Sequence, residues 1–203
     1  MIMKAVKIKI NSTRISSKIN KKKLKWATNF LQRKIKKNIY LNNEKVECIL
    51  IDQNSSNIEK FKKIYFKNNI EESFSINSIQ NNFKKVLIYG YDTRGLIYAI
   101  TEIADRIENL TTKKNNLKRI FYNTIENPKT KIRSISKCFE SDIEDLNWFY
   151  NKTMWKEYLD MLVSNRFNRF TFTLGMQYNY PYGNEFIKDV YFYLAYPFLV
   201  KPK

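Results

Sequence analysis

Several carboxylates and a tryptophan lie close together in one short polar stretch of the sequence. Glu140, Ser141, Asp145 and Trp148 fall between a run of alternating apolar residues and the next helical pattern. Carboxylate and hydroxyl oxygens bind sugar hydroxyl groups, and a flat indole face can stack on a pyranose ring. Such a loop could bind a sugar if it lies at the mouth of a site. An alternative stays open, because Asp145 or Asn147 could instead cap the helix that follows.

A second candidate lies in the tyrosine-rich stretch 175–182. Tyrosine combines a flat apolar ring with a hydroxyl group, which suits a sugar platform, and Tyr178 is the best ligand candidate. The aromatic residues of 191–199 could instead pack against this stretch. We favour packing for most of its other tyrosines.

The chemistry of the chain is limited by the residues it lacks. The sequence has no histidine, and its two cysteines, Cys48 and Cys138, are far apart with no second ligand residue nearby. Histidine-dependent acid–base and nucleophile systems are thus excluded within this chain, and neither a zinc site nor a disulfide framework is supported. We assign no catalytic residue, no metal and no cofactor, and any acid–base chemistry would have to use carboxylates.

The net charge is strongly positive, at +18 from 37 Lys and Arg against 19 Asp and Glu. Such an excess is typical of proteins that bind nucleic acids or anionic membranes. Lysine is spread through every region of this sequence instead of forming a basic stripe, so we expect no specific nucleic-acid partner. The first ten residues alternate apolar and charged, and no run of about 18 apolar residues occurs, so we expect a soluble cytoplasmic protein without membrane association.

The residues 1–110 show the pattern of an α+β domain, built from helices and a mixed sheet. Apolar residues recur at helical spacing in its expected helices and at period two in its hairpin. Asp92 or Thr93 is expected to cap the last helix. The expected elements, in order, are a strand over 1–10, a helix over 18–37, a strand over 46–51, a hairpin over 73–79 and 85–90, and a helix over 92–107.

A second, incomplete α/β unit is expected over 128–203. Residues 111–127 are polar and rich in lysine, and we interpret them as a linker that includes a return strand. A strand over 132–139, a helix over 151–164 and a strand over 167–174 then follow. Strand, crossover helix and strand in this order form a βαβ unit, whose two strands should be parallel.

One stretch of the first domain resembles hexosaminidase-like and α-glucuronidase-like glycoside hydrolases. Asp92, Arg94, Gly95 and Tyr98 are similar to the Asp-x-Arg-Gly-x-x-Tyr segment that ends the small α+β domain ahead of the barrel in these enzymes. The resemblance implies a hexosaminidase domain-2-like fold for 1–110. For the arginine and the glycine we favour structural roles, with Arg94 paired to a carboxylate and Gly95 allowing close packing.

The stretch from Pro128 to Gly175 resembles the start of the hydrolase barrel. Arg133 opens a strand, a Trp-Phe-Tyr run begins at Trp148, and the sequence Asn-Arg-Phe-Asn leads into the next strand from Asn165. The resemblance implies the first βαβ unit of a (β/α)8 barrel, or TIM barrel. Such a barrel needs about 250 residues, whereas only about 75 follow Pro128.

The resemblance implies an enzyme part that is inactive alone. The Asp-Glu pair of hexosaminidases follows the fourth barrel strand, which would lie beyond Lys203, so the missing barrel portion is an expected partner. The Asp and the sugar-contacting Arg of the first hexosaminidase strand have Cys138 and Ser141 as their counterparts here, so acetamido-sugar specificity is not implied. A non-catalytic module that binds a carbohydrate or a protein is the alternative, and a basic nucleic-acid binder is a third hypothesis.

Overall fold

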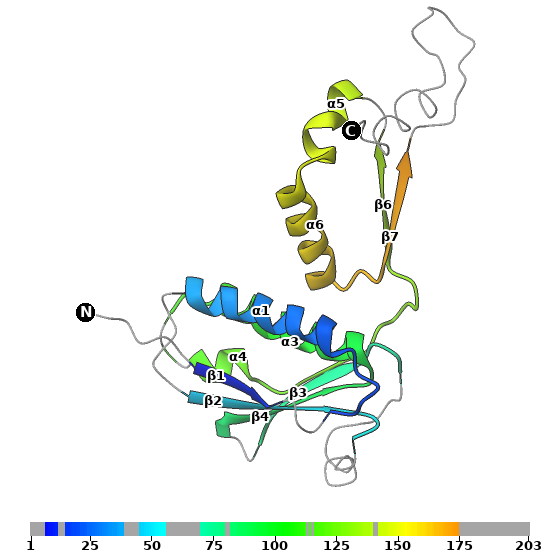
Figure 1. Cartoon of the computed structure of the whole chain (residues 1–203). Coiled ribbons are helices and arrows are strands. Elements are labelled where there is room, and N and C mark those ends of the chain that lie inside the picture. Colours follow the sequence, from blue (N-terminus) through cyan, green and yellow to red (C-terminus); the bar gives the residue numbers. More distant parts are fainter. Residues whose placement is uncertain are drawn as a thin grey trace, which may run out of the picture. The chain divides into compact units, whose positions relative to one another are not determined.

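The computed structural model describes residues 7–11, 15–38, 45–55, 70–79, 82–112, 114, 116–139 and 142–174. The chain divides into two compact units, Met1–Lys129 (unit 1) and Thr130–Lys203 (unit 2). Both units mix α and β structure, and each has a sheet of its own. Figure 1 follows both units along the sequence.

Unit 1 is built on a five-stranded mixed sheet in the order β1-β2-β4-β3-β5. Strands β1, β2 and β4 run parallel to one another, while β3 is antiparallel to both β4 and β5. The predicted hairpin is confirmed as the β3–β4 pair. In chain order the elements are β1 (Lys7–Asn11), α1 (Lys21–Lys37), β2 (Lys45–Asp52), β3 (Phe74–Ile79), β4 (Asn82–Gly90), α3 (Thr93–Glu108), α4 (Asn116–Ile120) and β5 (Thr124–Glu126).

Helices α1 and α3 lie side by side on one face of this sheet (Figure 1). The side chain of Asn20 caps α1 by accepting a hydrogen bond from the Lys23 backbone N–H. The apolar stripe of α1 is buried as its spacing predicts, from Leu24 to Ile35. Asp92, one of the two predicted caps, begins α3 and accepts from the Gly95 N–H at 2.8 Å. A hydrophobic core of unit 1 lies between the α1–α3 pair and the sheet face that these helices cover.

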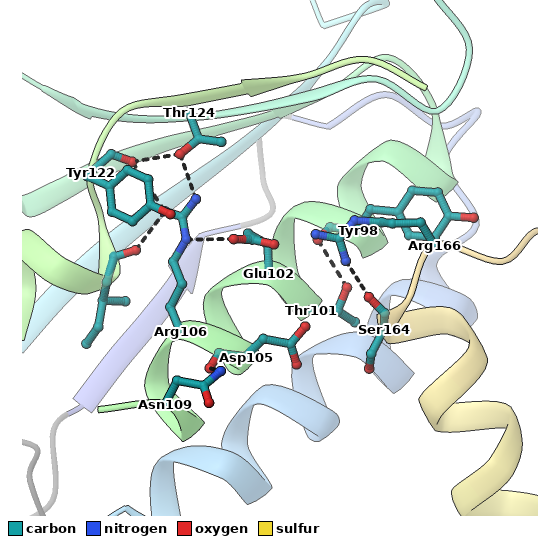
Figure 2. A network of polar contacts seen from close by, with 11 residues as sticks. Tyr98, Thr101, Glu102, Asp105, Arg106, Asn109, Tyr122, Thr124, Ser164 and Arg166 are labelled. Atoms are coloured by element: carbon teal, nitrogen blue, oxygen red, sulfur yellow. Dashed lines mark hydrogen bonds and ion pairs between the residues drawn. The ribbon is translucent and has the colours of Figure 1, made fainter. Parts of the chain in front are cut away.

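Residues 111–127, expected as a linker, contribute α4 and β5 to unit 1. Figure 2 shows the buried Arg106 guanidinium that holds them. It donates to Glu102 Oε1 at 2.8 Å, to the Ile120 carbonyl at 3.0 Å and to Thr124 Oγ1 at 2.6 Å. The Tyr122 ring lies under the guanidinium, 3.7 Å from ring centroid to Cζ. One side chain of α3 therefore anchors the return strand.

Unit 2 contains β6 (Ser134–Phe139), α5 (Asp142–Phe149), α6 (Lys152–Ser164) and β7 (Arg169–Leu174). The two strands pair in parallel, which confirms the predicted βαβ unit. The predicted loop after the first strand is wrong from residue 142 onward, where helix α5 begins. The alternative that Asp145 or Asn147 caps this helix is wrong, because both lie within α5, and Asn151 caps α6 by accepting from the Met154 N–H.

The amino ends of β6 and β7 are joined by a clamp formed by Arg133 and Asn168. The Asn168 side chain accepts from the Arg133 N–H at 2.9 Å and donates to the Lys131 carbonyl at 2.8 Å. The Arg133 Nε donates to the Arg166 carbonyl at 2.6 Å. These bonds fix the register of the two strands. They also give the Asn-Arg-Phe-Asn element of the sequence a structural role.

Candidate functional site

The candidate site lies where β6 ends and α5 begins. Because β6 and β7 are parallel, their carboxyl ends meet at one edge, which is where α/β folds usually place their binding groups. Of the five residues predicted to bind substrate, Asp145 and Trp148 lie on α5. Glu140, Ser141 and Tyr178 lie outside the described residues.

Asp145 and Trp148 are directly bonded to one another. They are three residues apart on α5, so their side chains share a helix face. The Trp148 indole Nε1 donates to Asp145 Oδ1 at 2.7 Å. This bond fixes the indole orientation and uses one carboxylate oxygen. Asp145 therefore positions the aromatic ring in addition to any contact that it makes with a ligand.

Trp148 belongs to an aromatic cluster that joins α5, α6 and β7. Its ring centroid lies 5.5 Å from that of Trp155 and 6.3 Å from that of Phe172, both in edge-on geometry. The second indole is also satisfied, since Trp155 Nε1 donates to the Phe149 carbonyl at 2.7 Å. Phe170 completes the cluster 6.0 Å from Trp155. The tryptophan is held rigidly, as a preformed platform requires.

Lys137 is a residue of this site that the sequence analysis missed. Its Nζ lies 4.0 Å from the Trp148 ring centroid and 5.9 Å from that of Tyr158. An ammonium over an indole face is attracted by the ring quadrupole. The signal was present in the sequence, because strand alternation puts Lys137 on the same face as Ile135, among apolar residues. A sugar that stacks on this face of Trp148 must displace the ammonium or bond to it.

Gly95 takes the close-packing role that we favoured, whereas Arg94, which we expected to pair with a carboxylate in the domain interface, pairs with Glu72 of unit 1. The Arg94 Nη1 pairs with Oε1 of the buried Glu72 at 2.6 Å, and hydrogen bonding to that carboxylate raises the pKa of Arg94. A Cβ on Gly95 would lie 2.3 Å from the Ser73 carbonyl oxygen, so only glycine fits there. The helix start is thus locked to the turn before β3.

Asp52 is a buried carboxylate at the carboxyl end of β2. Burial alone would raise its pKa, but hydrogen bonds from Ser16 and Ser55 outweigh burial and lower it. Ser16 donates through its backbone N–H at 2.9 Å and through Oγ, and Ser55 donates through Oγ. All these bonds are internal, so Asp52 ties the β1–α1 connection to β2. Its geometry indicates a structural carboxylate.

The remaining reactive groups of the described residues do not form a second chemical centre. Burial raises the pKa of the Cys48 thiol to about 12, which keeps it protonated and unreactive. In the described part of the chain, no three carboxylate or cysteine side chains come together as a metal ion would require. None of the helices in these ranges is both long enough and apolar enough to cross a bilayer.

Comparison with known proteins gives matches at the level of structure. No protein-family model and no curated protein matches the sequence. The chain is similar to a GH138 enzyme targeting pectin rhamnogalacturonan II, with a TM-score of 0.56 and 21% identity. It is also similar to a family GH115 4-O-methyl-α-glucuronidase with specificity for decorated arabinogalactans, with a TM-score of 0.57 and 14% identity.

These two matches cover 84% and 85% of this chain but 19% and 25% of the two enzymes. The chain thus spans about a fifth to a quarter of their length. At such identities the likeness shows the fold, and both structural neighbours are glycoside hydrolases. The fold is one used by carbohydrate-active proteins.

Proposed function

We propose that this chain forms the N-terminal portion of a glycoside-hydrolase-like protein of carbohydrate metabolism. Unit 1 would be its hexosaminidase domain-2-like α+β domain, and unit 2 the first βαβ unit of its (β/α)8 barrel. The observation that carries this proposal is the parallel β6–β7 pair with its crossover helices, preceded by a mixed α+β unit. The fold likeness to two glycoside hydrolases supports a glycoside-hydrolase-like protein.

The helix-free face of the β6–β7 sheet also supports a larger sheet. Strand alternation and register place Ser134, Ser136, Thr171 and Thr173 on this face, opposite the aromatic cluster, and all four are exposed. Parallel sheets are normally covered on both faces, and in barrels the strands close on one another. Within residues 130–139 and 142–174, a parallel pair with one uncovered face therefore suits the opening of a barrel.

Under this proposal the chain binds carbohydrate but does not hydrolyse it alone. The paired carboxylates of a glycosidase, one protonating the leaving oxygen and one stabilising the cationic centre, would come from later barrel strands. Asp145 and Trp148, with Glu140, Ser141 and Tyr178, would contribute substrate contacts at the mouth. The missing barrel portion would be the chain's partner, and we propose a cytoplasmic location.

Turnover measurements test the catalytic part of the proposal. The purified chain is incubated with a panel of aryl glycosides, and the released phenol is followed by absorbance. We expect no release above the buffer blank, because under this proposal the carboxylate pair would come from later barrel strands. Clear turnover that copurifies with the chain would contradict the proposal.

Glycan binding tests the site itself. Trp148→Ala should weaken the binding of at least one glycan on an array by about fivefold to tenfold, because an aromatic stacking face is lost. Trp148→Phe keeps a ring and should retain most of the affinity. Trp26→Ala, on α1 of unit 1, serves as the matched control. Equal binding by the wild type and Trp148→Ala would exclude this residue as a sugar contact.

A further inference from the structure

A hollow of about 710 Å³ opens at the amino ends of β1, β2 and β4 in unit 1. Four lysines from these three strands line the hollow. Lys9 comes from β1, Lys45 from β2, and the neighbours Lys84 and Lys85 from β4, so residues far apart in the sequence come together here. All four side chains are exposed. The dispersed positive charge of the sequence is therefore locally concentrated by the fold.

The strand register explains this concentration. Lys9 pairs with Glu47, and Glu47 pairs with Lys85, so the three side chains form a row across the sheet. Lys9 and Lys85 lie on strands that are two strand spacings, or about 10 Å, apart, and Glu47 lies on the strand between them. The described residues that line the hollow include these four lysines and one carboxylate, Glu47. A bound anion would relieve the repulsion among the lysines.

We propose that this hollow binds an acidic glycan, through carboxylate or sulfate groups that pair with the lysines. Lys9, Lys45, Lys84 and Lys85 supply donors for anionic groups, and Glu47 supplies an acceptor for sugar hydroxyls. The site lies on unit 1, so it does not depend on the proposed barrel role of unit 2.

The composition of the hollow favours a glycan over a nucleic acid. Proteins that hold single-stranded nucleic acids combine basic grooves with aromatic side chains on which the bases stack. Among the described residues that line this hollow, none is aromatic. Glu47 would also repel a closely spaced phosphate backbone, whereas it can bond to the hydroxyl groups of a sugar.

Isothermal titration of the full chain tests the inference with four probes: a short oligogalacturonate, a sulfated heparin-derived oligosaccharide of similar length, a neutral malto-oligosaccharide, and a single-stranded oligonucleotide. At least one acidic glycan should bind about tenfold more tightly than the neutral one, and added salt should weaken it. Which acidic probe binds better distinguishes carboxylate from sulfate recognition. Tighter binding of the oligonucleotide than of both acidic glycans would overturn the inference.

Paired variants separate the hollow from the overall charge. Lys84→Gln combined with Lys85→Gln should weaken acidic-glycan binding about tenfold. Lys22→Gln combined with Lys23→Gln removes the same charge from the exposed start of α1 and should leave binding within about twofold. Circular dichroism checks that both double variants are folded. An equal loss in both would overturn the site, and Trp148→Ala should leave this binding unchanged whether or not the proposed function holds.

Discussion

At the scale of single residues, the stability of unit 1 depends on a few positions where a small change would disrupt packing or hydrogen bonding. Gly95 is the clearest, because a Cβ added there would meet the Ser73 carbonyl and approach the Cα of Gly90. Asp52 is another, because its two oxygens accept the hydrogen bonds that hold the β1–α1 connection at β2. Both positions are structural, and both make sharp predictions.

Gly95→Ala should destabilise unit 1 by about 2 kcal/mol or more, because the added methyl group meets backbone that cannot turn aside. The free energy of unfolding from urea titrations measures the change. Asn29→Ala, at an exposed position of α1, is the control and should stay within about 0.5 kcal/mol of the wild type. Wild-type stability of Gly95→Ala would contradict the close approach at Ser73.

Asp52→Asn should lower stability at neutral pH by about 1 to 2 kcal/mol, because charged acceptors for Ser16 and Ser55 are lost. The folded-state pKa of Asp52 is lowered, so its contribution is complete above the ordinary value of 3.8 and is lost as pH falls through the folded value. The difference from wild type should therefore shrink below about pH 4. Urea unfolding at several pH values measures this stability difference, and the exposed Glu71→Gln is the charge control. A stability difference between Asp52→Asn and the wild type that grows in acid would contradict the prediction.

At the scale of elements, short segments are positioned by long-range contacts more than by their own sequence. Strand β5 has three residues and α4 has five, too few for a recognisable period. Their place is set by Arg106, which bonds to carbonyl and hydroxyl oxygens at 120 and 124 across α4 and β5. Replacing the Arg106 guanidinium should therefore free residues 116–126 from α3.

Arg106→Lys should cost about 2 kcal/mol or more, because a point-like ammonium cannot span Glu102, Ile120 and Thr124 together. Amide hydrogen exchange over 116–126 should rise more than exchange in α1. Arg33→Lys, on the exposed side of α1, makes the same chemical change and should leave both measurements near wild type. Unchanged protection of 116–126 in Arg106→Lys would mean that other contacts hold β5.

The longer elements could be predicted from the sequence, whereas much of the site geometry could not. Apolar periodicity identified α1, α3, α6 and the β3–β4 hairpin, and the Asp92 cap marked the start of α3, because those signals act within a few residues. Helix α5 was missed, since its carboxylates resemble a loop and its stability comes from packing of Trp148 on residues of α6 and β7. The place of Lys137 on an apolar face follows from strand alternation, whereas its ring partner Trp148 is supplied by another element and could not be predicted.

At the scale of the whole molecule, the two units differ in how completely they bury their sheets. The central strands β2 and β4 of unit 1 are buried on both faces, with Cys48 and Val86 toward the helices and Ile51 and Leu87 on the opposite side. Unit 2 has two parallel strands and one face lined by exposed serine and threonine. The units should therefore differ in their ability to fold separately.

A chain that ends at Lys129 should unfold cooperatively with urea, because unit 1 has its own core. A chain that begins at Thr130 should show little cooperativity, since the sheet in its described residues, 130–139 and 142–174, has two strands, and two-stranded sheets are marginally stable in water. Circular dichroism of the two separate chains measures both. A sharp transition in the second chain would indicate a self-sufficient unit and would count against the barrel proposal.

The strand order of unit 1 has a consequence for its synthesis. Strand β2 lies between β1 and β4, so its second edge stays open until Gly90 has left the ribosome. A nascent chain that carries only β1, α1 and β2 exposes an apolar parallel edge, which is prone to pairing with other chains. Stalled nascent chains that stop before β4 should therefore recruit chaperones, and those long enough to expose α3 should release them.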